Sequence, residues 1–399
     1  MDNMIYKQFK DKKLSALGYG GMRFPTHKIG GKDQINEADA EKQVMHAYEN
    51  GVNVFDTAFF YHGGESERVF GNILNKLPRD TWYLSSKMPG NMIDVKDGKL
   101  FLDVAWSGME NIAFDTPTDI FQYQLDKCGV DYFDFYMLHN VAEGTYDFYT
   151  DEKLGIIDCL LEEKKKGRIK HLGFSTHGRY ETIDKFLSKH SESMEFVLLQ
   201  INYLDWSLQE AQKKYEVIAK YNIPILAMEP VRGGKLINPG KEPEAILKAA
   251  KPDDSMAKWA FRFLQSLPNI LISVSGMSTM EQVKENLELF SKYDPMTDAE
   301  KEHVWKAVDA MASFVPCTTC RYCIDACPVK LDIPMLIATY NEASNDFEWY
   351  VREILGALSE KEKPAACIAC GVCNPLCPQD IDIPDILGKF SDLINEKTK

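Results

Sequence analysis

Eight of the ten cysteines in this chain fall in two short runs near its C-terminal end, each with the pattern C-x-x-C-x-x-C-x-x-x-C-P. The first run contains Cys317, Cys320, Cys323 and Cys327, and the second contains Cys367, Cys370, Cys373 and Cys377. Soft thiolates at this pitch can hold three corners of an iron–sulfur cube. A zinc site or a disulfide framework is the alternative. Two complete runs, both closed by Cys-Pro, favour iron–sulfur clusters.

The two runs resemble those of bacterial two-cluster ferredoxins, in which the fourth cysteine of each run binds the other cluster. The resemblance implies two [4Fe-4S] clusters. Cluster 1 would take Cys317, Cys320, Cys323 and Cys377, and cluster 2 would take Cys367, Cys370, Cys373 and Cys327. The segment 328–366 between the runs is longer than in a minimal ferredoxin, and it has helical character over Ile333–Asn341 and Phe347–Leu358. It is similar to the helical cluster domain of succinate dehydrogenase iron–sulfur subunits.

Four further residues could handle a proton and a hydride. Asp56 and Tyr61 follow one predicted strand, Lys87 follows the next, and His139 follows a third. A carbonyl that accepts hydride develops oxyanion charge, which a nearby proton donor must neutralise. Tyr61 can be that donor, and a buried Lys87 ammonium would lower the pKa of its phenol. Asp56 would keep Lys87 charged and in place, while His139 would orient the carbonyl oxygen.

These residues need strands to position them, and the pattern up to residue 290 supplies eight apolar runs, most of them separated by helical stretches such as 38–50 and 155–167. The predicted strands are Leu17–Gly20, Val52–Thr57, Trp82–Ser86, Phe133–Leu138, His171–Ser175, Phe196–Ile201, Ile223–Met228 and Ile270–Val274. Eight such units predict an α/β fold of the (β/α)8 TIM barrel type. A doubly wound open sheet is the alternative, but no G-x-G-x-x-G turn follows an early strand.

Residues 1–290 resemble the aldo-keto reductase superfamily, whose catalytic tetrad is Asp, Tyr, Lys and His. The motif D-x-A-x-x-Y matches Asp56, Ala58 and Tyr61, Lys87 follows Leu-Ser-Ser, and His139 follows Tyr-Met-Leu. The resemblance implies a NAD(P)-dependent oxidoreductase with these four residues as its catalytic group.

The same resemblance implies an extended NADP or NAD molecule bound without a Rossmann fold. The implied cofactor-binding residues are Ser175, Gln200, Met228, Pro230, Val231, Arg232, Gly233, Gly234, Lys235, Gly276, Met277, Ser278, Gln282, Glu285 and Asn286. Three positions depart from the family. Thr176 replaces the Asn of a Ser-Asn pair, Met228 stands where a stacking Tyr is usual, and Gln282 stands where many NADP-preferring members carry Arg. The choice between NADPH and NADH therefore stays open, and no motif supports a flavin.

We expect a barrel over residues 1–290, a helical linker over 291–316 and a mainly helical two-cluster ferredoxin-type domain over 317–399. The long connection 88–118 could shape the mouth of the barrel, or it could be a surface excursion with a small core of its own. Cys128 and Cys159 lie outside the two runs and are expected to be core thiols.

Composition excludes several classes of protein. The formal net charge is −14, which argues against a nucleic-acid partner. No apolar run is long enough to predict a transmembrane span, and the first residues show no secretory signal. Thiolates poised for iron suit a reducing compartment, so we expect a cytoplasmic protein.

The two halves pose a physical problem, because nicotinamide moves two electrons and a four-iron cluster moves one. The leading hypothesis is an enzyme that reduces an aldehyde or ketone, or oxidises the matching alcohol, with clusters for electron transfer or for structure. One alternative is a redox-relay subunit linked to a ferredoxin or another electron carrier, with or without a flavin. Another is a nicotinamide-binding regulatory protein with slow chemistry. The sequence does not identify the small-molecule substrate or the oligomeric state.

Overall fold

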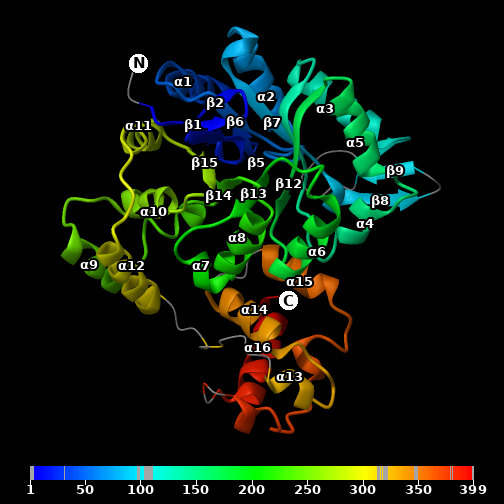
Figure 1. Cartoon of the computed structure of the whole chain (residues 1–399), viewed down its shortest axis with the longest axis vertical. Helices are drawn as coiled ribbons and strands as arrows, with labels where there is room; N and C mark the ends of the chain where they lie inside the picture. Colours follow the sequence, from blue (N-terminus) through cyan, green and yellow to red (C-terminus); the bar gives the residue numbers. More distant parts are fainter. Residues whose placement is uncertain are drawn as a thin grey trace.

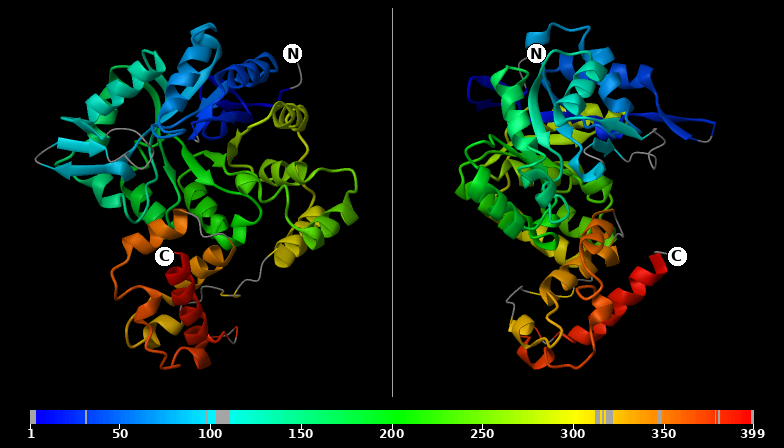
Figure 2. Two further views of the ribbon diagram at one scale, coloured as in Figure 1. Left: turned by 180° about the vertical axis from the view of Figure 1, so that it is seen from behind. Right: turned by 90° about the vertical axis from the view of Figure 1, so that its right-hand side faces the viewer.

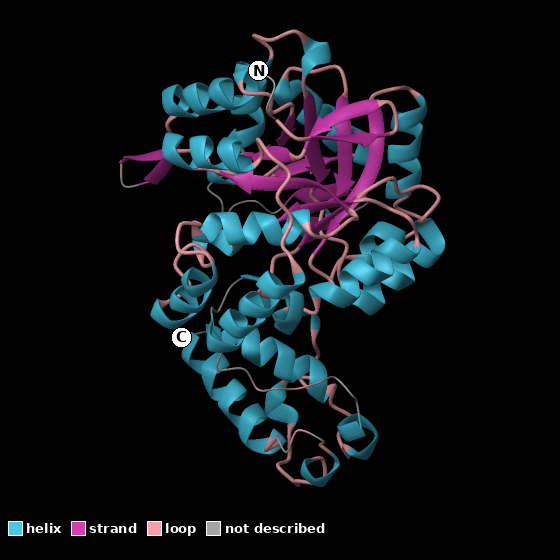
Figure 3. Cartoon of the chain, turned by 60° about the vertical axis from the view of Figure 1, so that its left-hand side comes forward, coloured by secondary structure: helices cyan, strands magenta, loops and turns pink. Residues whose placement is uncertain are grey.

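Eight parallel strands close into a barrel in the upper part of the molecule (Figures 1 and 3). They are β3 (Leu17–Gly20), β6 (Val54–Asp56), β7 (Tyr83–Met88), β11 (Phe133–Leu138), β12 (Ile169–Thr176), β13 (Val197–Gln200), β14 (Ile225–Met228) and β15 (Ile270–Gly276). The computed structural model describes residues 4–30, 32–96, 99–102, 111–311, 315, 317, 322–345, 349–377, 379 and 381–397. The predicted (β/α)8 barrel is confirmed, because β15 pairs with β3 and β7 pairs with β11, so the eight parallel strands form a closed ring.

A helix follows each barrel strand and packs outside the barrel, as the alternating pattern predicts. These helices are α1 (Glu37–Glu49), α2 (Glu65–Leu74), α3 (Pro117–Cys128), α5 (Ile156–Lys165), α6 (Tyr180–His190), α8 (Ala211–Lys220), α10 (Met256–Gln265) and α11 (Met280–Leu289). Shorter or additional helices extend the loops: α4 (Tyr146–Thr150), α7 (Asp205–Leu208) and α9 (Lys241–Ala250). Cys128 is buried at the end of α3, and Cys159 is partly buried on α5.

A hairpin of β1 (Tyr6–Phe9) and β2 (Lys12–Ser15) closes the N-terminal end of the barrel. Phe9 is 5% exposed and packs against the rings of Phe135 and His171, with centroid distances of 5.6 and 4.9 Å. Lys7 Nζ donates to the carbonyl of Ile270 at the first residue of β15. The floor of the barrel is therefore filled by side chains, which leaves the opposite end for loops and chemistry.

Two insertions decorate the barrel. The hairpin of β4 (Thr26–Ile29) and β5 (Lys32–Ile35) projects from it, as the right-hand view of Figure 2 shows. The long connection before β11 forms a three-stranded antiparallel sheet of β8 (Ile93–Lys96), β9 (Lys99–Leu102) and β10 (Ile112–Phe114). Phe114 packs on Tyr123 of α3 at 5.6 Å, so this excursion joins the main core. Residues 97, 98 and 103–110 of this connection lie outside the described residues.

Helix α12 (Asp298–Met311) forms the centre of the predicted linker and packs on the barrel. Glu300 accepts two hydrogen bonds from Arg262 of α10, at 2.8 and 2.9 Å. Because Arg262 is almost fully buried, this bidentate pair fixes α12 against the barrel.

The C-terminal module has its own core and consists of α13 (Tyr322–Ala326), α14 (Ile333–Asn345), α15 (Trp349–Ala357) and α16 (Ile383–Lys397). A four-residue segment, Leu/Ile-Asp-Ile-Pro, occurs twice, at 331–334 and 381–384, and leads into α14 and α16. Ile333 and Ile383 are each 1% exposed. This equivalence agrees with an internal duplication. Within the described ranges, no helix combines the length and apolar character needed to cross a membrane.

Replacing Phe9 by Ala should lower the free energy of unfolding by about 3 kcal/mol, because the change leaves a cavity in the barrel floor. Urea unfolding followed by far-UV circular dichroism measures it. Ile29→Ala is the matched control, since Ile29 is 52% exposed on the projecting hairpin and its loss should change stability by less than about 0.5 kcal/mol. Equal effects of the two changes would show that the hairpin does not seal the barrel.

Candidate active site

A buried ion pair lies at the C-terminal end of the barrel. Lys87 Nζ is 2.9 Å from both carboxylate oxygens of Asp56 and donates to the carbonyl of Thr57 at 2.6 Å. Ser85 donates a further hydrogen bond to Asp56 at 2.6 Å. Lys87 is 1% exposed, so its ammonium has exchanged water for these oxygens. Burial lowers the pKa of Lys87, but Asp56 and Tyr61 together more than compensate, and the pKa lies above its ordinary value.

Tyr61 lies directly beside this pair and is partly exposed. Lys87 Nζ is 4.9 Å from the centroid of the Tyr61 ring. Burial raises the pKa of the Tyr61 phenol and the Lys87 ammonium lowers it, with the net pKa above its ordinary value. The effect of Lys87 has the expected sign, but desolvation is the larger contribution. In this state Tyr61 is a protonated phenol that can donate.

His139 completes the group at the end of β11. Its ring stacks on Phe60 with a centroid distance of 4.9 Å and meets the Tyr61 ring edge-on at 6.4 Å. Burial, together with the charge of Lys87, holds the pKa of His139 well below its ordinary value, so the imidazole is neutral. Its Nδ1 is buried without a hydrogen-bond partner among the described residues. The four residues predicted at three strand ends therefore lie together.

A second buried carboxyl supports the site, and its partners come from segments that a sequence pattern does not pair. Glu67 on α2 accepts hydrogen bonds from Ser86 at 2.5 Å and from Gln124 of α3 at 2.6 Å. Gln124 also donates to the carbonyl of Lys87 at 3.1 Å. Burial raises the pKa of Glu67. This network fixes the backbone that carries Lys87.

The residues expected to hold a cofactor sit at the same end of the barrel, and several of the polar ones have hydrogen-bond partners inside the protein. The Ser175 hydroxyl accepts from the Asn140 amide at 2.8 Å, and Gln200 donates to Asp205 at 2.9 Å. Gln282 caps its own helix, α11, by accepting from Ser278 at 2.7 Å. Asn286, also on α11, donates to the Ser275 hydroxyl at 3.0 Å. Met228 ends β14, and the segment 230–235 follows it.

Arg232 is placed differently from its expected role near a pyrophosphate. Arg232 is 3% exposed, and its guanidinium forms an ion pair with Asp205 at 2.9 Å and pairs with Glu342 of α14. Two carboxylates therefore hold this charge at the contact with the module. Arg23, which the sequence did not single out, lies between two glycines of the cofactor segments instead. A methyl group added at Gly233 or Gly276 would meet its side chain at 2.9 or 3.0 Å.

The thiols of the two cysteine runs gather in the module. Cys323, Cys327 and Cys373 are buried in its core, and Cys370 is exposed. Burial raises the pKa of Cys373, and the thiols of Cys367, Cys370 and Cys327 add to this increase. Cys327 of the first run therefore lies near the second run, as a crossed ligand set requires. Cys320 lies outside the described residues. Among those that are described, no three acidic, His or Cys side chains converge on a single metal ion.

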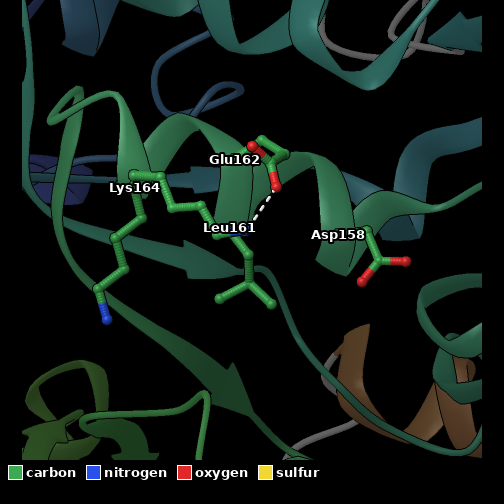
Figure 4. Close-up of a pocket in the computed structure, with 5 residues that line it drawn as sticks. Asp158, Leu161, Glu162 and Lys164 are labelled. Atoms are coloured by element: carbon green, nitrogen blue, oxygen red, sulfur yellow. Dashed lines mark hydrogen bonds and ion pairs between the residues drawn. The ribbon is translucent and has the colours of Figure 1, made fainter.

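A surface hollow of about 470 Å³ lies on α5, away from these groups (Figure 4). Asp158, Leu161, Glu162, Lys164 and Lys165 line it, and all belong to one helix. Since none of them is at a barrel strand end, we assign it no role in the chemistry.

The barrel resembles solved structures of known reductases. The holo form of an aldo-keto reductase from Bacillus halodurans superposes with a TM-score of 0.59 at 23% identity, over 76% of this chain and 96% of that one. A thermostable aldo-keto reductase solved with the inhibitor epalrestat gives a TM-score of 0.57 at 18% identity, over 76% of this chain and all of that one. At these identities the likeness concerns the fold.

Curated relatives match the same region. An uncharacterized oxidoreductase of Bacillus subtilis is 24% identical over 299 residues, 70% of this chain and 88% of its own length. An NADH-specific methylglyoxal reductase of Escherichia coli is 29% identical over 171 residues, 41% of this chain and 48% of its own length. A family model described as "Aldo/keto reductase family" matches residues 16–308, and one described as "4Fe-4S dicluster domain" matches residues 316–382. This chain belongs to the aldo/keto reductase family and carries a 4Fe-4S dicluster domain after its barrel.

Proposed function

We propose that the protein interconverts an aldehyde or ketone and the corresponding alcohol, with NADPH or NADH as the hydride donor. The observation that carries this proposal is the buried Asp56–Lys87 pair beside the partly exposed ring of Tyr61. A buried lysine keeps its charge only where a carboxylate such as Asp56 stabilises it. A fixed positive charge beside Tyr61 in turn stabilises the phenolate that forms when Tyr61 donates its proton.

In this proposal the nicotinamide, when bound, supplies the hydride to the carbonyl carbon. The π electron pair of the C=O bond moves to the oxygen, which takes the proton of Tyr61. The Lys87 ammonium stabilises the phenolate that remains, and Asp56 keeps that ammonium from moving or losing its proton. The neutral His139 imidazole lies edge-on to Tyr61 and would orient the carbonyl oxygen by a hydrogen bond.

The residues that would hold the nucleotide are those at the ends of β12 to β15, and Ser175 and Gln200 are the ones that would bind its carboxamide. Of the two nucleotides, we propose NADH. Gln282 supports NADH, because it caps its own helix and brings no positive charge to a 2′-phosphate. A relative named as NADH-specific points in the same direction.

We further propose two [4Fe-4S] clusters in the module, with the crossed ligand sets given above. Cys327 of the first run lies near Cys373 of the second run, which supports ligand sets that exchange their fourth cysteine. An electron-relay role is the second candidate function, because Cys370 is exposed where a ferredoxin or another one-electron carrier could approach. Labile thiolates of this kind suit a reducing, cytoplasmic location.

Tyr61→Phe should lower kcat for carbonyl reduction by at least about 100-fold, because the oxyanion loses its proton donor. The dissociation constant for NADH or NADPH should stay within about twofold, since this change removes only a hydroxyl. Stopped-flow hydride transfer to 4-nitrobenzaldehyde and fluorescence titration measure the two effects. Tyr293→Phe, a surface change that removes one hydrogen bond to Gln265, is the control. Full turnover in Tyr61→Phe would refute the assignment.

Cys373→Ser should lower iron and sulfide from about eight of each per chain to about four, with loss of roughly half the visible absorbance. The protein is purified without air and assayed for iron, sulfide and zinc. Cys159→Ser, which changes a thiol outside both runs, should keep the full iron content. Colourless protein with zinc at these thiols would contradict the cluster assignment.

A further inference from the structure

Asn140, the residue directly after His139, joins the loops that follow two barrel strands. It is 2% exposed and has a left-handed backbone, φ 58°, a conformation that Asn tolerates better than most residues. Its amide donates to Ser175 Oγ at 2.8 Å, and its side-chain oxygen accepts from the His177 amide at 3.0 Å. Thr145 donates to its carbonyl. Asn140 therefore ties the end of β11 to the end of β12.

The remaining polar group of Asn140 reaches the cluster module. Its Nδ2 donates to Glu353 Oε1 of α15 at 2.6 Å. One turn earlier on α15, Trp349 meets the His177 ring edge-on at 4.6 Å. In Figure 1, α15 lies between the barrel and the rest of the module. The same helix thus contacts both barrel loops that Asn140 joins.

Two other ion pairs hold the module at this end of the barrel. Arg179, after β12, pairs with Asp332 at 3.1 Å. Arg232, after β14, pairs with Glu342, which also accepts from Gln209 at 3.1 Å. The module is therefore docked on loops after β12, β13 and β14 as well as on Asn140.

A cavity of about 240 Å³ lies beside Glu353, between the two halves. Its lining includes the titratable or charged residues Glu143, His177, Arg179, Glu353 and Glu362. This volume corresponds to roughly eight water molecules. Glu353 is therefore not sealed in solid packing, and a proton can reach its carboxyl group.

We propose that Glu353 of the cluster module is a positioning residue for the barrel's active site, which holds Asn140 and, through it, the loops that carry His139 and Ser175. The roles of His139 and Ser175 in this inference are those that the proposed function gives them. It makes the barrel and the module a single functional unit, in which release of α15 loosens the reacting end of the site.

The charges around Glu353 give this contact a pH dependence. Burial raises the pKa of Glu353 to about 7, Glu143 adds to the increase, and the hydrogen bond from Asn140 opposes it. The other groups that face the cavity do not neutralise it. Burial lowers the pKa of His177 to about 3, Arg179 is shared by Asp332 and Glu181, and Glu362 is a further carboxylate.

A released Glu353 ionises near its ordinary pKa of about 4.5, whereas the docked residue ionises near 7. Docking therefore takes up a proton between these values. The docked arrangement is strongest below pH 4.5, weakens by up to about tenfold per pH unit up to pH 7, and is constant above that.

Hydrogen exchange on the cluster-loaded full chain tests the proposal. The amides of Asn140, Ala142 and His177 are followed by mass spectrometry from pH 5 to pH 9, with correction for intrinsic rates. In wild type, their protection should fall between pH 5 and 7 and then level off. In Glu353→Gln the profile should be flat, because the side chain no longer ionises. Glu360→Gln removes an exposed carboxylate of the same module, paired with Lys363, and should follow wild type.

Glu353→Ala gives a second readout, because it removes the partner of Asn140 altogether. It should lower protection of the same amides at least fivefold at pH 5.5, without loss of iron. Unchanged protection in Glu353→Ala, or the wild-type profile in Glu353→Gln, overturns the proposal. The readout does not depend on carbonyl turnover. A wild-type protein that behaves as described but reduces no carbonyl refutes the proposed function and leaves the Glu353 contact standing.

Discussion

A buried ammonium group is the constraint around which the barrel's site is arranged. An isolated charge in the interior costs several kcal/mol, and the cost is offset only where good partners surround it. Lys87 meets Asp56 with both oxygens and also a backbone carbonyl, while Ser85 and the Glu67–Gln124 network fix the supporting strands. The position beside Tyr61 is thus determined by several elements that are distant in sequence.

The parts of this arrangement that follow from local patterns could be predicted. Strand ends come from apolar runs bounded by turns, so the sequence located Asp56, Lys87 and His139 on one barrel face. The cysteine spacing likewise indicated the module. What could not be predicted are side-chain pairings between segments far apart in the chain. Arg232 has the positive charge that binds a phosphate, and the sequence placed it in such a site. In the structure it pairs with Glu342 of the other domain.

The burial of the titratable side chains could not be predicted from the sequence either. The expected effect of Lys87 on Tyr61 has the right sign, but its outcome depends on how much water the phenol loses. The positions of Glu67 and Glu353 have the same origin. Each is an ordinary carboxylate by sequence, and each is shifted because the surrounding elements remove its solvent. A single sequence shows which titratable groups are present. It does not show how far each is removed from water, and that removal sets the pKa.

The hairpin at the barrel floor limits the routes by which a ligand can reach the active site. With Phe9 and the packed side chains around it filling that end, anything that reaches Lys87 and Tyr61 must enter and leave by the opposite end of the barrel. The C-terminal module stands at that opening. The loops around that opening are also the loops on which the module is docked, so a shift of the module would change access to Tyr61.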